Sequence, residues 1–305
     1  MNINTPPLTI VAGEPFQIGK KPTLGRFISI GDSVTIGDNC SIEDNVTIGN
    51  HVTIGNGVTI ESGVCICDKV RIDDNSHLAS GVVFAKGKDQ DPTKTLPLTI
   101  VSSEALIGAN STICRTTIGS NSIVKPGTVV TQKVPSNAIV CGNPAKITGY
   151  IDADIVTKSK HAIYPKDKPY ISRTGAQIFS IPKFSDMRGE LSVVEIEHIL
   201  PFAVKRLFYT YNIDTELVRG EHAHIHCHQF LIAVAGSVNV VCDDGYNREE
   251  FTLDSPQAGI HIPPLCWGVQ YKHSKDNILL VLASHSYEAD DYIRDYDAFL
   301  KFIAS

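Results

Sequence analysis

The 305-residue sequence lacks the features that mark several large classes of protein. It has no run of about 18 apolar residues, so it offers no candidate for a membrane-spanning helix. Its first residues contain no basic segment followed by an apolar one, which argues against secretion and predicts a cytoplasmic protein. Its 27 basic side chains are outnumbered by 33 acidic ones, which disfavours wholesale binding to nucleic acid but leaves room for a local basic pocket.

Cysteine is present, but not in any paired CxxC spacing. In a reducing compartment we therefore expect no disulfides and interpret the cysteines as small buried apolar residues. They are Cys40, Cys65, Cys67, Cys114, Cys141, Cys227, Cys242 and Cys266. The length by itself predicts about two domains.

The first half carries a six-residue repeat. Apolar residues recur at Ile30, Ile36, Ile42, Ile48, Ile54, Ile60, Ile66, Ile72, Leu78 and Phe84. A second series, mostly valine, follows four residues after each of these, and both series should point inward. Glycine or a small polar residue often follows the apolar anchor, which is turn chemistry at a fixed place in each unit. The pattern predicts a parallel β-coil in which each unit is one strand and one corner.

The period breaks at residues 85–98, a charged stretch with two prolines that predicts an extruded loop. It resumes at Val101, and the segment 107–147 then resembles the closing coils of hexapeptide-repeat acyltransferases. The ending CGNPAK is the most specific part of this resemblance. It implies a left-handed parallel β-helix over residues 1–150, assembly as a homotrimer, and acetyl-CoA as co-substrate.

The same resemblance implies a set of coenzyme A contacts: Lys125, Pro126, Gly127, Gly142, Asn143, Pro144 and Lys146. Gly127 and Gly142 would remove side chains where a pantetheine arm lies close to the backbone, and Lys146 would meet a phosphate. The alternative interpretation is that these glycines and prolines merely close the coil.

The acceptor side of a transferase needs a neutral amine, and a nearby base can remove its proton. The candidates are His77 and Asp89. Sugar N-acetyltransferases of this kind often carry an Asn-Asp pair after the phenylalanine that starts the loop, but Phe84 is followed by AKGKD. Three alternatives therefore stay open: His77 is a surface histidine without a role, the amine enters already neutral, or this half only trimerises the chain. His51 at a corner is interpreted as solvated.

Residues 151–175 mix charges and prolines without a period and predict a linker. Beyond it, short β-rich runs separated by turn signals predict an antiparallel barrel or jelly roll over residues 176–305. The end, at residues 290–304, has helical spacing and predicts one terminal helix. The fold class is thus all-β in both halves, with this short helix at the end.

Four histidines occupy positions 222, 224, 226 and 228, and a strand with period two would put all four on one face. Such a row suggests metal binding or acid–base chemistry. The spacing resembles the first cupin motif, but metal cupins expect an acid where Gln229 stands and a histidine where Gly268 stands. His261 or His273 could substitute, so a metal site is weakened and no metal is expected.

Several segments together resemble the WxcM/FdtA-type dTDP-sugar 3,4-ketoisomerases. They are FSDMRGELSVVE (184–195), PFAVKRLFYTYN (201–212), RGEHAHIHCHQ (219–229), PPLCW (263–267) and DDYIRDYDAF (290–299). These enzymes are metal-free cupins that interconvert 4-keto and 3-keto 6-deoxyhexoses. The resemblance implies a proton-transfer pair, His222 and His224, with Tyr209 as an auxiliary acid. It also implies nucleotide contacts from Arg206, Arg219 and Gln229. Alternatively, Arg219 forms a structural ion pair and Tyr209 packs in the core.

The two resemblances together predict a bifunctional enzyme acting on dTDP-linked deoxy and amino sugars. The C-terminal half would prepare a 3-keto sugar, a separate aminotransferase would place the amine, and the N-terminal half would acetylate it. A trimeric β-helix combined with cupin dimers would give a hexamer of 32 symmetry. Two alternatives remain: a metal-dependent cupin, or a non-catalytic sugar-nucleotide module on an acetyltransferase.

Overall fold

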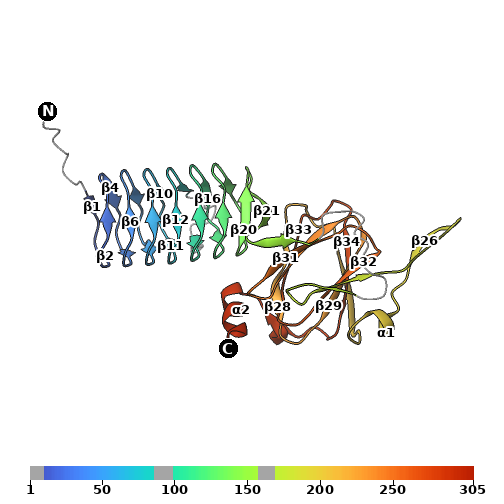
Figure 1. Ribbon diagram of the computed structural model, residues 1–305. Coiled ribbons are helices and arrows are strands. Elements are labelled where there is room, and N and C mark those ends of the chain that lie inside the picture. The colour runs from blue at the N-terminus through green and yellow to red at the C-terminus, as the bar shows by residue number, and fades with distance from the viewer. Residues whose placement is uncertain (1–9, 86–98, 157–168) are drawn as a thin grey trace, which may run out of the picture. The chain divides into compact units, whose positions relative to one another are not determined.

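The computed structural model describes residues 10–85, 99–156 and 169–305 and divides the chain into two compact units, Met1–Ile151 and Asp152–Ser305 (Figure 1). Two short strands lie inside the predicted linker, β22 (Ala153–Ile155) and β23 (Tyr170–Ile171). Both pair with strands of the second unit, far along the chain or beyond a turn. Strands of two or three residues depend on such partners, which is why the local sequence did not reveal them.

The first unit is a parallel β-solenoid whose strands stack in three sheets. From β1 to β19, strands three positions apart in the series pair with each other, and at the end of the third sheet β18 pairs with β20. One sheet contains β1 (Ile10–Ala12), β4 (Ile28–Ile30), β7 (Thr47–Ile48), β10 (Cys65–Ile66), β13 (Val83–Ala85), β16 (Thr112–Cys114) and β19 (Val129–Val130). The second contains β2 (Phe16–Ile18), β5 (Val34–Ile36), β8 (Thr53–Ile54), β11 (Val70–Ile72), β14 (Thr99–Val101) and β17 (Thr117–Ile118). The third contains β3 (Thr23–Leu24), β6 (Ser41–Ile42), β9 (Thr59–Ile60), β12 (His77–Leu78), β15 (Leu106–Ile107), β18 (Ile123–Val124), β20 (Ala138–Cys141) and the antiparallel β21 (Lys146–Tyr150).

The interior of the solenoid is formed by the two predicted apolar series, and this prediction is confirmed. Every anchor from Ile30 to Phe84 is buried, as are the valines of the second series. Ser76 is the polar member of that series, and its hydroxyl donates to the backbone carbonyl of Ser102, which satisfies it inside the core. The resumed register is also buried, at Val101, Ile107 and onward.

The corners between strands show a second pattern with a six-residue period, in the backbone conformation. One residue at each corner has positive φ, as at Asn39, Asn45, Gly57, Gly63 and Asn75. Only glycine and, to a lesser degree, asparagine and aspartate adopt this left-handed conformation at low cost. Next to these corners, side-chain Oδ1 atoms of Asp or Asn accept backbone N–H groups 18 residues earlier in the chain, one coil away. These preferences account for the Gly and Asn corners, whereas other corners of the series carry different residues at positive φ, as at Phe27 and Lys69.

The stack continues across the break in the period. Strand β11 pairs in parallel with β14, so that Val70 lies opposite Thr99, and β13 pairs with β16. The predicted loop after Ala85 falls on residues 86–98, outside the described residues. The strands on either side of it keep their inward series buried.

The second unit contains two six-stranded sheets that enclose one core. The first contains β22, β31 (Arg248–Leu253), β30 (Val238–Asp243), β33 (Trp267–Tyr271), β28 (Arg219–His224) and β35 (Tyr292–Ile293). The second contains β23, β24 (Gln177–Ser180), β32 (Ala258–Ile262), β29 (Gln229–Ala235), β34 (Ile278–Ala283) and β27 (Arg206–Tyr211). A separate hairpin, β25 (Lys183–Asp186) with β26 (Gly189–Ser192), and a short helix, α1 (Ile196–Ile199), complete the unit. Apart from the parallel pair β22–β31, the pairing in both sheets is antiparallel, as expected for a cupin-type barrel.

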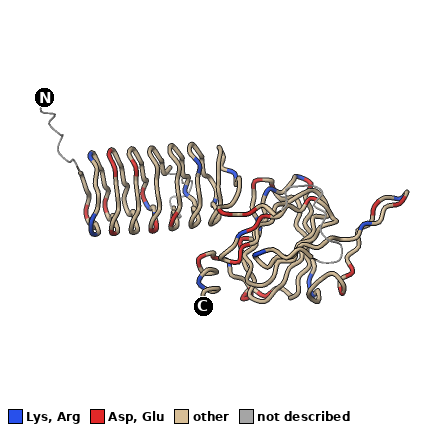
Figure 2. The backbone as a smooth tube through the Cα atoms, viewed as in Figure 1, with Lys and Arg blue, Asp and Glu red and all other residues tan. Residues whose placement is uncertain are grey.

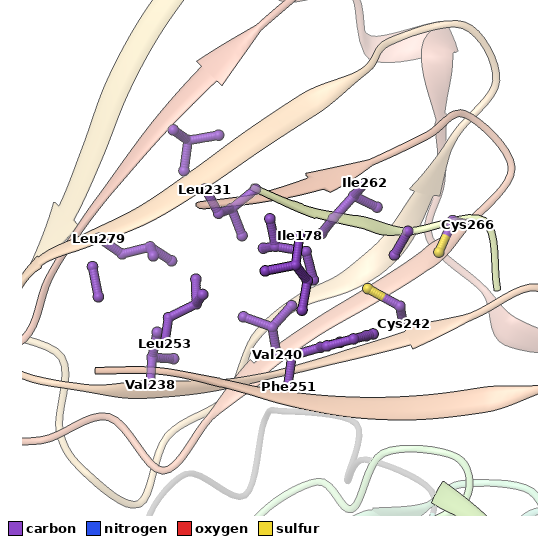
Figure 3. Close-up of a cluster of buried hydrophobic side chains, with 14 residues drawn as sticks. Ile178, Leu231, Val238, Val240, Cys242, Phe251, Leu253, Ile262, Cys266 and Leu279 are labelled. Atoms are coloured by element: carbon purple, nitrogen blue, oxygen red, sulfur yellow. The ribbon is translucent and has the colours of Figure 1, made fainter. Parts of the chain in front are cut away.

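Side chains from both sheets form the core of the barrel, among them Ile178, Leu231, Val240 and Phe251 (Figure 3). The thiols of Cys242 and Cys266 also lie in this cluster. All eight cysteines are free, as predicted, but Cys65 and Cys141 are exposed and Cys114 is half-buried, so the expectation of burial is wrong for these three.

The terminal segment is not one helix. A 3-10 turn, η1 (Ala289–Asp291), and strand β35 precede α2 (Tyr296–Ile303), whose N-terminus is capped by the side chain of Asp295. Strand β35 pairs with β28, and this tertiary pairing overrides the helical spacing of residues 290–295. Along the described backbone, charges of both signs are interspersed in each unit (Figure 2). Among the described residues, no helix is both long and apolar enough to span a bilayer.

Candidate active site

A small pocket in the second unit is lined by several of the side chains for which the sequence predicts a chemical role. Strand β28 brings His222 and His224 to it, with ring centroids 4.9 Å apart and the ring planes nearly perpendicular. A bulge between Gly220 and His222, with positive φ at Glu221, sets the direction of the strand there. The pocket is lined by His222, His224, Cys227, Gln229, Ile262, Pro263, Cys266, Gly268 and Gln270.

The terminal segment supplies two partners that the sequence did not reveal. Asp291 Oδ2 lies 2.7 Å from His224 Nδ1, and both side chains are buried. Because a carboxylate only accepts hydrogen bonds, His224 carries its proton on Nδ1. Tyr292 packs its ring against both histidines, at centroid distances of 4.9 Å from His222 and 4.3 Å from His224. The only sequence signal for Asp291 was its place in the DDYIRDYDAF motif.

Hydrogen bonds also fix the other ring nitrogens. The amide of Gln229 donates through Nε2 to His224 Nε2 at 3.0 Å, so the lone pair of that nitrogen accepts the hydrogen bond from Gln229. His222 Nδ1 donates to the backbone carbonyl of Gly220 at 2.9 Å, which leaves His222 Nε2 as an acceptor. Both imidazoles are therefore held neutral, with one lone pair each.

The electrostatics support this protonation state. Burial lowers the pKa of His222 to about 4, against the hydrogen bond to Gly220. Burial also lowers the pKa of His224, although the contact with Asp291 opposes the shift. Burial alone would raise the pKa of Asp291, but hydrogen bonds from His224 and from the backbone of His226 and Cys227 hold that pKa below its ordinary value. Neutral histidines beside an ionised aspartate suit proton abstraction near pH 7.

The expected row of four histidines on one face is wrong. Strand β28 ends at His224, and the chain bends before β29, so the period-two alternation stops. His226 is exposed. His228 instead stacks on His261 outside the pocket, with His228 Nδ1 and His261 Nε2 2.9 Å apart and Phe202 packed against both rings. His273 is buried and bonded to Asn277, away from the histidine pair.

The structure separates the other predicted residues of this unit. Tyr209 is 58% exposed on the face of β27 opposite to Arg206 and Phe208, so this chain does not bring it to the histidine pair. Strand alternation is the reason, and Tyr292 is the tyrosine that lies there. Arg206 stacks on the rings of Phe208 and Tyr287 and acts electrostatically on His224. Arg219 is exposed at the start of β28.

In the solenoid, the predicted coenzyme A residues fall on two neighbouring turns of the last coils. Lys125, Pro126 and Gly127 form an exposed corner after β18. Gly142, Asn143 and Pro144 lie exposed in the turn between β20 and β21, and Lys146 is the exposed first residue of β21. The backbone N–H of Lys125 donates to the carbonyl of Val140 on β20, which joins this corner to the strand before the turn. Gly127 has φ +70° and belongs to the corner series, so the closing of the coil already explains this glycine.

His77 lies on β12, with its Nε2 2.7 Å from Glu61 Oε1. The other carboxylate oxygen of Glu61 accepts both the hydroxyl and the backbone N–H of Ser80. These contacts, those from Ser80 first and that from His77 next, lower the pKa of Glu61. Sequence reasoning missed Glu61, which orients the predicted base. Asp89 lies outside the described residues, and His51 occupies one of the positive-φ corners.

Comparisons with known proteins identify the family. The FdtA model, described as WxcM-like, C-terminal, matches residues 174–304. The TDP-4-oxo-6-deoxy-alpha-D-glucose-3,4-oxoisomerase of Aneurinibacillus thermoaerophilus is 40% identical over 128 residues, which are 42% of this chain and 92% of that protein. The chain belongs to the FdtA family. A crystal structure of a 3,4-ketoisomerase from Helicobacter canadensis aligns with this FdtA domain at 36% identity, covering 43% of this chain and 98% of the other, with a TM-score of 0.41.

Beside its FdtA domain, the chain matches the bacterial transferase hexapeptide family (six repeats) at residues 17–50 and 51–86 and the hexapeptide repeat of succinyl-transferase at 99–132. The 2,3,4,5-tetrahydropyridine-2,6-dicarboxylate N-acetyltransferase of Clostridium perfringens (strain SM101 / Type A) is 40% identical over 85 residues, 28% of this chain and 35% of that protein. This chain thus spans about a third of the length of that acetyltransferase. The predicted combination of an isomerase family with a transferase repeat is confirmed.

Proposed function

We propose that the second unit interconverts a dTDP-4-keto-6-deoxyhexose and its 3-keto isomer. The observation that carries the proposal is the pair of neutral imidazoles, one of them bonded to a buried carboxylate. Membership of the FdtA family and the 3,4-oxoisomerase relative support the substrate class. Arg206, Arg219 and Gln229 are our candidates for contacts to the nucleotide, the arginines through their fit to phosphate.

The reaction moves two protons and needs no net acid or base. In our proposal, substrate displaces the Gln229 N–H from His224 Nε2, and this nitrogen then takes the C3 proton while Asp291 stabilises the imidazolium that forms. His222 accepts the hydroxyl proton from O3 and delivers it to O4 of the enediolate. His224 then returns its proton to C4. The C3–H and O3–H bonds break, C4–H and O4–H bonds form, and both histidines regain their starting state.

Proton NMR in deuterated buffer tests this function. Wild-type protein mixed with dTDP-4-keto-6-deoxyglucose should lose the C3 proton signal and form the 3-keto species. The variants His222→Asn and His224→Asn should do neither, whereas the exposed neighbour substitution His226→Asn serves as the matched control and should behave as wild type. Binding without exchange in wild-type protein would favour a non-catalytic sugar-nucleotide module instead.

For the first unit we propose acetyl-CoA-dependent N-acetylation of a dTDP-3-amino-3,6-dideoxyhexose. The hexapeptide families and the acetyltransferase relatives support transfer of an acyl group. His77, oriented by Glu61, is our candidate base, with Asp89 as the second candidate. Lys125, Pro126, Gly127, Gly142, Asn143, Pro144 and Lys146 are the proposed coenzyme A contacts.

Calorimetric titration with acetyl-CoA tests the coenzyme site. Lys146→Ala should weaken binding, and Lys20→Ala, between β2 and β3 in the first coil, should not. If wild-type protein binds no acetyl-CoA, the solenoid serves as a trimeriser only. A thiol-release assay with the amino sugar then tests His77→Asn and Glu61→Gln, which should both slow transfer if the dyad is the base.

The two activities fit one route to a 3-acetamido-3,6-dideoxyhexose in the cytoplasm, with a separate aminotransferase acting between them. We further propose a homotrimer through the solenoid, extended to a hexamer if the cupin units also pair. Sedimentation equilibrium of the full chain distinguishes these masses. A monomer at micromolar concentration would contradict the assembly.

A further inference from the structure

Three side chains at the pocket form a set of potential metal ligands. The proposed proton transfer does not require all three of them. His224, Cys227 and Asp291 each offer one ligand atom, and the three atoms lie within 4.8 Å of one another. A nitrogen, a sulfur and a carboxylate oxygen around one point suit Zn²⁺ or Co²⁺ in tetrahedral geometry with one open position. We propose that this cluster binds such a cation and that the bound cation blocks the isomerase. The blocking effect rests on the proposed function, whereas the binding does not.

Cys227 is the member that makes the cluster a metal site rather than a histidine–aspartate pair. It lies in the bend between β28 and β29, is buried, and lines the pocket. Its thiol donates to the carbonyl of His228 at 3.4 Å, and the Ser284 hydroxyl lies 3.8 Å from the sulfur. That hydroxyl can donate to a thiolate once the thiol proton is lost.

The charges around the cluster determine how tightly we expect it to bind a cation. A divalent cation with one thiolate and one carboxylate is neutral overall, which favours its burial. Arg206 and Arg294 both act electrostatically on His224 and oppose a further positive charge. We therefore expect binding weaker than that of a closed structural zinc site.

The movement of protons on cation binding explains the inhibition. Asp291 contacts His224 Nδ1, and that nitrogen must lose its proton to ligate a cation. The proton moves to Nε2 of the same ring, and the thiol proton of Cys227 leaves for solvent, so one proton is released per cation. Gln229, now 3.0 Å from Nε2 through its NH₂ group, can turn its amide to accept from that new N–H. His224 then lacks the lone pair that proton abstraction needs.

Cobalt spectroscopy on untagged full-length protein tests the binding. We expect one Co²⁺ per chain, with a near-ultraviolet sulfur-to-cobalt charge-transfer band and the strong visible bands of tetrahedral cobalt. Cys227→Ala should lose the charge-transfer band, and Cys227→Ser provides a second variant of similar volume if the alanine variant misfolds. Cys266→Ala is the matched control, because Cys266 also lines the pocket but is no member of the cluster, and it should keep the band. A missing band in wild type, or a band that persists in both Cys227 variants, overturns the site.

Inhibition is measured separately. With EDTA present, the rate of solvent proton exchange is measured first for wild type and for Cys227→Ala, which checks the isomerase itself, and the effect of Zn²⁺ on each protein is expressed relative to its own rate in EDTA. Added Zn²⁺ should then stop wild type, and Cys227→Ala should need about 10- to 100-fold more Zn²⁺ for the same effect. Activation by Zn²⁺ would overturn the inhibitory role and favour a metal-dependent cupin. No exchange even in EDTA would overturn the proposed function while leaving the cobalt result intact.

Discussion

In the solenoid, the neighbours of a side chain lie at a fixed distance along the sequence, whereas the pocket of the second unit joins side chains at no fixed spacing. Oδ1 of Asp38 accepts from a backbone N–H 18 residues away, and the same separation recurs in the next coils. In the pocket, His224 is separated from its partner Asp291 by 67 residues and from Gln229 by 5. In the repeat, contacts can thus be predicted from a constant sequence separation. In the barrel, the candidate active site forms where strands from distant parts of the chain meet.

The largest effect is expected when Asp291, the distant partner of His224, loses its charge. Asp291→Asn keeps the shape but loses the charge that fixes and stabilises His224, so we expect the isomerisation rate to fall by about 10²-fold or more. Solvent proton exchange measures this rate. Asp290→Asn changes the exposed neighbouring residue and should leave the rate unchanged. Equal rates for the two variants would mean that the aspartate is only structural.

A core substitution tests the repeat. Ile60 is fully buried in the middle of the stack, and its replacement by alanine should lower the free energy of unfolding by about 2–5 kcal/mol. Thr59→Ala, at the outward-facing neighbour on the same strand, should cost far less. Denaturant titration followed by circular dichroism provides both values. A loss below about 1 kcal/mol for Ile60→Ala would show that the coils repack around the missing side chain.

Acid should weaken the second unit selectively. The pKa values of His222 and His261 are about 4 because of burial, against an ordinary value of 6.5. The unfolded chain binds more protons between these values, so stability is present above pH 6.5 and is lost as the pH falls toward 4, by about 3 kcal/mol per histidine. The fluorescence of Trp267, the single tryptophan, reports on this unit alone. His261→Gln should flatten the pH dependence, and an unchanged slope would contradict the assignment.

The smallest effect concerns a corner. Gly127→Ala places a Cβ at positive φ and should cost about 1 kcal/mol, whereas Gly127→Asn should cost less because asparagine tolerates this conformation. Open space surrounds the position where a Cβ would stand. Comparing acetyl-CoA binding by the two variants separates the corner role from the proposed coenzyme contact. Normal binding in Gly127→Asn would leave only the corner role.

Much of the fold follows from the sequence because local rules suffice for it. Burial selects Ile and Val at alternating inward positions, and the left-handed corners favour Gly and Asn, so the six-residue period predicts the solenoid. The strands of the barrel also followed from their β-rich runs. Strand β35 did not, because the residues around Tyr292 have helical spacing and become a strand only through pairing with β28.

The site was predicted in part for the same reason. His222 and His224 share a short motif, so their pairing was visible from the sequence. Asp291 reaches His224 only after the terminal segment docks, and Tyr209 turns away because Arg206 and Phe208 occupy the inward positions of its strand. The row of histidines ended where β28 ends, which depends on the bend before β29 rather than on the histidines themselves.

The pairing of β11 with β14 has a consequence for how such a protein can change. Val70 lies opposite Thr99 in the same register that joins coils elsewhere, although the intervening chain is longer. The pairing of the strands therefore keeps its register although the chain between β13 and β14 is longer than the other connections. Insertions at this point, by evolution or by design, can therefore leave the strand pairing of the solenoid unchanged.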